Sequence, residues 1–126
     1  MAEAREGRRK QGDEAEEAAA RYLSAKGLRI VQRNFYCRGG EIDIVAWDGD
    51  TLVFIEVRYR GSGSLENPME SVTARKQQRL IHAAANYLQR QRHWQAPCRF
   101  DVIAITPGRF RRYRAQWIKN AFDAST

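Results

Sequence analysis

The sequence predicts an α/β domain in which helices flank a mixed sheet, in the order αβββαβ followed by a variable end. Three observations predict it. Apolar residues near the N-terminus recur at helical spacing, strand-like runs pair around a tight turn in the middle, and a long amphipathic helix separates them from a further strand. The length of 126 residues suits a single domain with one substantial core.

The first predicted helix begins near Asp13 and ends at Gly27, which suits a helix stop. Five of its residues share one buried face: Ala15, Ala18, Ala19, Tyr22 and Leu23. Residues 1–11, before this helix, are expected to form a flexible tail.

Strands are predicted over residues 28–36, 41–47, 51–60 and 98–106, with a turn at 48–50 between the second and the third. A polar, glycine-rich loop covers 61–68. The long helix covers about 71–92, and its inward stripe comprises Val72, Leu80, Ala84, Tyr87 and Leu88. Residues 119–122 are expected to form a short terminal helix.

The composition indicates a soluble protein with a polyanionic partner. The hydrophobic fraction is 43% and the net charge is +7, which favours nucleic acid. No apolar run approaches the roughly 20 residues of a membrane span, and the N-terminus lacks a secretory signal, so a cytoplasmic location is expected. The arginines expected to contact a nucleic-acid backbone are Arg60, Arg75, Arg79, Arg111, Arg112 and Arg114.

Two carboxylates interrupt the most strand-like segment, "GEIDIVAWDGDTLVFIEVRYR". Strand side chains alternate between faces, so Ile42 and Ile44 are expected on one face and Asp43 on the other. Asp43 lies directly opposite Glu56 if residues 49 and 50 are central in the turn, and diagonally from it if residues 48 and 49 are. Both registers bring the two acids together.

Like charges facing each other destabilise a sheet, so something must offset the repulsion between Asp43 and Glu56. Arg58, two residues beyond Glu56 on the same face, offsets part of it. A divalent cation would offset more, because carboxylate oxygens suit magnesium and leave positions for phosphate and water. The alternative is an Asp–Glu–Arg network without a metal.

Asp43 followed by Glu56-Val57-Arg58 resembles the PD-(D/E)XK signature of restriction-endonuclease-like nucleases. The chain is also similar to the small bacterial YraN family, which looks like a relative of Holliday-junction resolvases. This similarity covers nearly the whole chain after the first ten or so residues, through the blocks "GDEAEEAAARYL", "GEIDIVAWDG", "VFIEVRYR", "SVTARKQQRL", "AAANYL", "RFDVIAI" and "NAF".

The resemblance implies a restriction-endonuclease-like αβββαβ core and a metal-dependent nuclease acting on DNA, with branched DNA as the favoured substrate and with Mg²⁺ or Mn²⁺ held by Asp43 and Glu56. Glu16 aligns with a first-helix acid that such nucleases add to the metal site; the alternative is an acid that favours the helix dipole. A homodimer is also implied, because a two-fold protein suits a two-fold junction.

Two departures from the signature matter. Ile42 replaces a proline that shapes the strand, and Arg58 replaces a lysine. Arginine stays protonated, so Arg58 can stabilise developing charge but cannot act as a general base. Lys76, expected within the apolar stripe of the long helix, either extends its charged end to solvent or supplies the catalytic cation in place of Arg58.

Three classes of function follow. The first is the nuclease, and the second is a nucleic-acid-binding module that kept the fold and lost the reaction. A scaffold that binds an acidic partner is the third, and it leaves the pairing of Asp43 with Glu56 unexplained. Asp101, which interrupts the last predicted strand, has arginines nearby and is expected to form an ordinary ion pair.

Overall fold

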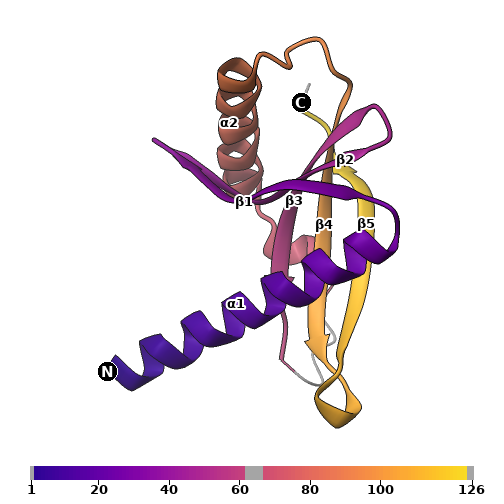
Figure 1. Cartoon of the computed structure of the whole chain (residues 1–126). Coiled ribbons are helices and arrows are strands. Elements are labelled where there is room, and N and C mark those ends of the chain that lie inside the picture. Colours follow the sequence, from indigo (N-terminus) through magenta and orange to yellow (C-terminus); the bar gives the residue numbers. More distant parts are fainter. Residues whose placement is uncertain (1, 62–66, 125–126) are drawn as a thin grey trace.

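The structure is a computed structural model that describes the backbone of residues 2–61 and 67–124, and the side chains of these ranges apart from 2–11 and 111. Figure 1 shows the arrangement of the helices and strands. In chain order the elements are α1 (Ala2–Ala25), β1 (Arg29–Cys37), β2 (Gly40–Asp48), β3 (Thr51–Tyr59), the short 3-10 helix η1 (Pro68–Ser71), α2 (Ala74–Gln91), β4 (Cys98–Pro107), the 3-10 turn η2 (Arg109–Arg111) and β5 (Tyr113–Phe122).

The strands form one mixed sheet with the order β1-β2-β3-β4-β5. β3 and β4 are parallel, and each of the other neighbouring pairs is antiparallel. The parallel pair requires a crossover connection, which α2 supplies. The predicted mixed α/β fold is therefore confirmed. Neither α-helix, within the described ranges, combines the length and apolar character needed to cross a membrane.

The core has two parts, one on each face of the sheet. Ala19 and Leu23 of α1 pack with Val53 and Ile55 of β3. Phe54, between those two strand residues, packs instead with residues of α2. α1 and α2 therefore cover opposite faces of the sheet, which places them on the two sides of the strands in Figure 1.

α1 is longer than predicted, because it begins at Ala2 and not near Asp13. The segment before Asp13 is rich in Ala, Glu, Arg and Lys, all of which favour helix, and its two glycines do not end it. The mobility expected of residues 1–11 stays a prediction. The predicted buried face is confirmed in Ala15, Ala19 and Leu23, and Ala20 is buried as well.

α2 is shorter than predicted at its N-terminal end. The helix begins at Ala74, after the Thr73 side chain accepts a hydrogen bond from the Lys76 backbone N–H. Residues 68–71 form η1 instead. At the other end Arg92 adopts a left-handed conformation with φ 57°, which stops the helix where it was predicted to end.

The short helix predicted over residues 119–122 is wrong, because these residues complete β5. β5 pairs antiparallel with β4 and covers its edge. The register shifts between Phe100 and Val102 of β4, and Asn120 in this region has φ 52°. The backbone N–H of Asn120 donates to the Asp101 carboxylate at 2.8 Å. Pairing with β4 therefore overrides the local preference of this short segment.

The expectation that Ile42 and Ile44 share a face is also wrong. Ile44 packs in the core under α1, whereas Ile42 packs in the core under α2. The alternation is interrupted between them, at the level where Asn34 of the neighbouring strand has φ 54°. The left-handed residue in β1 changes the twist of the β1–β2 strand pair at this point. The side chains of β2 before and after it, Ile42 and Ile44, therefore reach opposite faces of the sheet.

Gly40 allows β2 to approach α2 closely. A Cβ at this position would overlap the backbone carbonyl oxygen of Arg79 and lie 3.1 Å from the Ala83 methyl group. Since a helix backbone cannot swing aside, we expect Gly40→Ala to lower the free energy of unfolding by about 1–3 kcal/mol in urea titrations. Gly61→Ala is the control, because no atom of the described residues lies within 4 Å of a Cβ at that position. Equal stability of the two variants would contradict this packing.

Candidate functional site

The β2–β3 hairpin places Asp43 opposite Glu56. Asp48 pairs with Thr51, and the register continues to Ile44 opposite Ile55, so the next facing position is occupied by the two acids. Residues 49 and 50 are central in the turn, and Gly49 has φ 60°. Of the two registers that the sequence left open, the directly opposed one is thus observed.

At the end of the β2–β3 ladder, the Asp43 side chain accepts a hydrogen bond that a backbone carbonyl group would otherwise accept. Its Oδ2 accepts a hydrogen bond of 2.8 Å from the Val57 backbone N–H. This bond fixes the carboxylate against β3, beside Glu56, whose side chain is 18% exposed. The two acids are therefore held together by backbone geometry and are largely shielded from water.

The electrostatics reflect this proximity. Burial, followed by the negative charge of Glu56, raises the pKa of Asp43 to about 8, against the opposing effect of the Val57 N–H. Burial also raises the pKa of Glu56, although the positive charge of Arg58 opposes that shift. Two carboxylates in this arrangement resist simultaneous ionisation at neutral pH unless a cation joins them.

Arg58 extends along the same face as Glu56. Its Nη1 lies 3.5 Å from Glu56 Oε1, and its Nε donates to the Ser71 hydroxyl oxygen at 3.1 Å. Ser71 in turn donates from its hydroxyl to the Pro68 carbonyl oxygen at 2.7 Å. The guanidinium is consequently fixed between β3 and η1, with one side facing the acid pair.

Lys76 reaches the same place from α2. Its Nζ donates to the backbone carbonyl oxygen of Ser71 at 3.2 Å. Lys76 is exposed, as expected of a side chain that extends its charged end to solvent, and its catalytic role stays a prediction. Val72 precedes the Thr73 cap, so Val72 and Lys76 do not belong to one row of the helix.

A small cavity of about 130 Å³ lies beside Glu56, Arg58 and Lys76, and Asp43 is not among the residues that line it. It is lined by residues of β2, β3 and α2, namely Glu41, Glu56, Arg58, Lys76, Arg79 and Leu80. Arg79 was expected only to contact a nucleic-acid backbone, although its position one helical turn after Lys76 could have placed it here. Nothing in the sequence signals that Ser71 anchors both Arg58 and Lys76.

Glu16 lies near the site but does not line the cavity. It faces β1, where its Oε2 is 3.8 Å from Arg33 Nη2 and its side chain is hydrogen-bonded to Asn34. Burial raises the pKa of Glu16, and the charge of Glu16 in turn contributes to raising the pKa of Asp43. The predicted third acid is therefore close enough to influence Asp43, and it already has a partner in Arg33.

The acid pair could hold a divalent cation together with a substrate. Among the described residues, no group of three or more His, Cys, Asp or Glu side chains is arranged to hold a metal ion alone. Magnesium often binds through one or two carboxylates and takes its other ligands from water and phosphate. Asp43 and Glu56 fit that mode better than a closed structural metal site.

The predicted phosphate-contacting arginines are distributed around the sheet end where β3 and β4 finish. Arg60 is the first residue after β3. Arg112 lies in the turn between β4 and β5, and Arg114 lies at the start of β5. Arg75 and Arg79 lie in the first two turns of α2. Four of these side chains are exposed: Arg75, Arg79, Arg112 and Arg114. The side chain of Arg111 lies outside the described residues.

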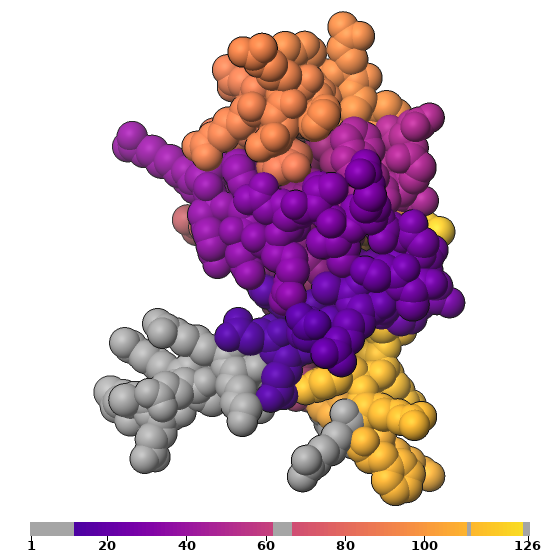
Figure 2. All heavy atoms as spheres, viewed as in Figure 1, coloured from indigo at the N-terminus to yellow at the C-terminus, as the bar shows by residue number. Residues whose placement is uncertain are grey.

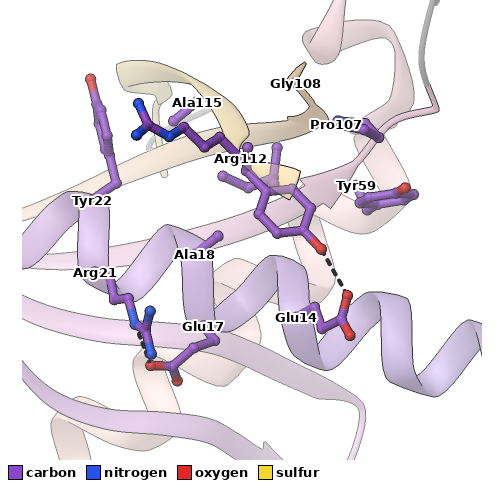
Figure 3. A pocket seen from close by; sticks show the side chains of 12 residues that line it. Glu14, Glu17, Ala18, Arg21, Tyr22, Tyr59, Pro107, Gly108, Arg112 and Ala115 are labelled. Atoms are coloured by element: carbon purple, nitrogen blue, oxygen red, sulfur yellow. Dashed lines mark hydrogen bonds and ion pairs between the residues drawn. The ribbon is translucent and has the colours of Figure 1, made fainter. Parts of the chain in front are cut away.

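A larger groove, of about 1010 Å³, lies on the α1 face of the sheet (Figure 3). Its walls come from α1 and from the base of the β4–β5 hairpin, and the Tyr113 hydroxyl donates to Glu14 across it at 2.8 Å. Arg21 and Glu17 on its helical wall form a salt bridge of 3.0 Å. The sheet separates this groove from the acid pair, so the groove is not part of the candidate site.

Asp101 forms the ion pair expected of it. The carboxylate is fully buried and accepts two hydrogen bonds from Arg99, at 2.9 and 3.0 Å. It accepts two more, from the Trp117 indole N–H at 2.9 Å and the Asn120 backbone N–H at 2.8 Å. With all these donors in place, Asp101 is a structural link between β4 and β5.

Comparison with known proteins places this chain in a family. Residues 15–105 match the family described as "Uncharacterised protein family UPF0102". A UPF0102 protein of Marinobacter nauticus is 55% identical over 121 residues, which cover 96% of this chain and 98% of that protein. A UPF0102 protein of Stutzerimonas stutzeri is 50% identical over 115 residues, 90% of this chain and 94% of that protein. These matches confirm the family part of the resemblance noted above, and this protein belongs to the UPF0102 family.

Proposed function

We propose that this protein is a cytoplasmic, metal-dependent nuclease that hydrolyses phosphodiester bonds in DNA, with branched DNA as the favoured substrate. The observation that carries the proposal is the pairing of two largely buried carboxylates, Asp43 and Glu56, beside the cations Arg58 and Lys76. The resemblance to the PD-(D/E)XK signature supports the same reading, because the signature combines these residue types on two successive strands.

Asp43 and Glu56 would hold Mg²⁺ or Mn²⁺, and Glu16 would complete the site through the metal or through water. A divalent cation bound there supplies a Lewis acid that polarises a phosphate and lowers the pKa of an attacking water. The raised pKa values of both acids reflect mainly their burial, and Arg58 offsets the charge of Glu56 only in part. The hydrogen bond from Val57 N–H keeps Asp43 oriented toward Glu56.

Arg58 and Lys76 would stabilise negative charge that develops on the phosphate during hydrolysis. Arg58 remains protonated at ordinary pH, so it acts through charge and hydrogen bonding and not as a base. Both cations are anchored to Ser71, one to its hydroxyl and the other to its carbonyl. This shared anchor would hold them in place before substrate arrives.

Six arginines, of which Arg79 also lines the cavity, would bind the phosphate backbone without reading base sequence, so affinity should fall steeply with added salt. They are Arg60, Arg75, Arg79, Arg111, Arg112 and Arg114. A homodimer, which would present two such sites to a two-fold junction, forms part of the proposal.

A second candidate is a DNA-binding module that has lost the reaction. The specific observation in its favour is the ion pair of 3.5 Å between Arg58 and Glu56, at the position where the signature has lysine. This pair neutralises part of the charge that would attract a metal. Such a module would bind the same DNA through the same arginines.

Cleavage assays with linear, flapped and four-way DNA in magnesium or manganese distinguish the two candidates. Asp43→Ala is expected to reduce cleavage about 100-fold or more, because the transition state would lose several kcal/mol of metal-dependent stabilisation. Asp50→Asn, an exposed acid at the opposite end of the same hairpin, is the matched control and should retain full activity.

Each outcome has a defined meaning. Cleavage that depends on Asp43 supports the nuclease, whereas cleavage unchanged in Asp43→Ala would identify a contaminating enzyme. Binding without cleavage in either metal would reject the nuclease in favour of the module. Absence of DNA binding even at low salt would reject both candidates.

A further inference from the structure

The tip of the β4–β5 hairpin, residues 108–112, presents a bare aromatic side chain. Phe110 is 92% exposed, compared with 63% for Tyr36 and 61% for Trp94. Its backbone has φ 56° and ψ 43°, a left-handed conformation that bulky residues rarely adopt. Strained conformations of this kind persist where the surrounding structure enforces them, and they concentrate at functional sites.

The hairpin tip is held by its own backbone. The Gly108 N–H donates to the Arg112 carbonyl oxygen, and the Arg112 N–H donates to the Arg109 carbonyl oxygen at 3.1 Å. A Cβ at Gly108 would lie 2.8 Å from the Arg112 carbonyl oxygen, so this closure requires glycine. Tyr113, just after the tip, ties the hairpin base to α1 through Glu14. Phe110 is therefore presented by a fixed turn.

The side chains around Phe110 are positively charged and unpaired. Arg109, Arg112 and Arg114 are exposed, and within the described part of the chain none of these side chains forms a hydrogen bond or an ion pair. By contrast, the guanidinium of Arg99 is fully engaged with Asp48 and Asp101. The hairpin tip thus combines an apolar ring with guanidinium groups that have no internal function.

Those charges decide which partner suits the ring. A second copy of this chain that met this tip with its own tip would bring arginines against arginines, which repel. A nucleic acid can bind both groups, because its phosphates pair with the arginines and an unstacked base can stack on the Phe110 ring. We propose that Phe110 stacks on an unpaired or partly unstacked base of DNA, while the adjacent arginines hold the flanking phosphates.

The position of the tip relative to the acid pair makes the inference more specific, and this step rests on the proposed function. Glu56 of β3 pairs with Val102 of the parallel strand β4, and Pro107 lies five residues further along β4. Five residues of strand extend about 17 Å. Figure 1 shows the turn between β4 and β5 at the lower end of the sheet, and Figure 2 shows atoms of this segment protruding there.

DNA advances about 3.4 Å per base along a strand, so 17 Å corresponds to about five nucleotides. A phosphate at the acid pair and a base at Phe110 would therefore be separated by roughly half a turn of duplex. Phe110 would favour substrates whose pairing is interrupted at that distance, as occurs at the branch of a flap or a junction.

Equilibrium binding in EDTA tests this without requiring catalysis. The probes are fluorescently labelled fully paired duplex and flap DNA carrying 2-aminopurine in the unpaired arm, and the variants are Phe110→Ala and Phe110→Trp. We expect Phe110→Ala to weaken flap binding about fivefold or more and to abolish the change in 2-aminopurine emission, with little effect on duplex. Phe110→Trp should restore both signals.

Equal weakening on flap and duplex, no weakening on either, or no binding of any DNA would overturn the inference. Binding to anionic phospholipid vesicles that depends on Phe110, without a Phe110 effect on DNA, would assign the tip to a membrane surface instead. Thermal unfolding confirms that the variants are folded. A protein that binds flap DNA through Phe110 but never cleaves it would leave this inference intact and reject only the nuclease.

Discussion

Asp101→Asn is expected to lower the free energy of unfolding by about 3–5 kcal/mol, the range for removing one partner of a buried ion pair. The carboxylate is fully buried and accepts four hydrogen bonds, two of them from Arg99. Asparagine keeps the size of the side chain but loses the charge and presents an N–H₂ group to donors. Urea unfolding at neutral pH measures the change.

The matched control is Asp50→Asn, the same substitution at an exposed turn, which should alter stability by less than about 0.5 kcal/mol. Arg99 also pairs with Asp48 at 3.0 Å, so its charge is not left wholly alone in Asp101→Asn. A loss below about 1 kcal/mol would show that Arg99, Trp117 and Asn120 find other partners, and that Asp101 does not link β4 to β5 as described.

Asp43→Asn is expected to make the protein more stable above pH 8 and to remove most of the pH dependence of its stability. The pKa of Asp43 is raised in the folded protein to about 8, from an ordinary value of 3.8. Between these values the folded state binds more protons than the unfolded state, so stability falls as pH rises, by up to about 1.4 kcal/mol per pH unit. Glu56 is shifted in the same direction and contributes likewise.

Urea titrations of the metal-free protein from pH 5 to pH 9 measure this slope. Asparagine can still accept the hydrogen bond from Val57 N–H, so the substitution removes charge and little else. Glu70→Gln, at an exposed acid of η1, should keep the wild-type slope. A wild-type protein whose stability rises steadily over this range would contradict the burial of the pair. Under the proposed function, added magnesium should stabilise the wild type and leave Asp43→Asn unaffected.

A stabilising substitution at Asp43 would carry a functional meaning. Sites that hold charges ready for a ligand are commonly less stable than their neutral versions, because the repulsion is relieved only when the ligand binds. Loss of cleavage together with a gain in stability in one variant would therefore separate a catalytic role for Asp43 from a structural one.

Local patterns predicted most of the fold. Residue spacing of period two and a two-residue turn are enough to set a hairpin register, which is why Asp43 could be placed near Glu56 without a structure. The buried face of α1 followed from helical spacing in the same way. Such predictions succeed because the residues that decide them are close together in the chain.

Several of the failures involve residues that depend on distant partners. Residues 119–122 belong to a strand because β5 pairs with the edge of β4 and because the Asp101 carboxylate accepts a hydrogen bond from the Asn120 backbone N–H. Ile42 lies on the opposite face of the sheet from Ile44, contrary to the prediction, because the strand pair is irregular beside Asn34 of β1, which has positive φ. The role of Glu16 in the site stays a prediction, and only the structure shows that Arg33 of β1 lies 3.8 Å from its carboxylate.

The order of helices and strands, and the meeting of two acids on neighbouring strands, follow from local patterns, because side-chain alternation and turn length act over a few residues. The way in which two cations converge beside those acids depends on the packing of segments distant in the chain. Arg58 and Lys76 come from different elements and converge through Ser71, in a short helix that no periodicity predicts. Packing of η1 and α2 against the sheet sets that convergence, and packing is a property of the whole chain.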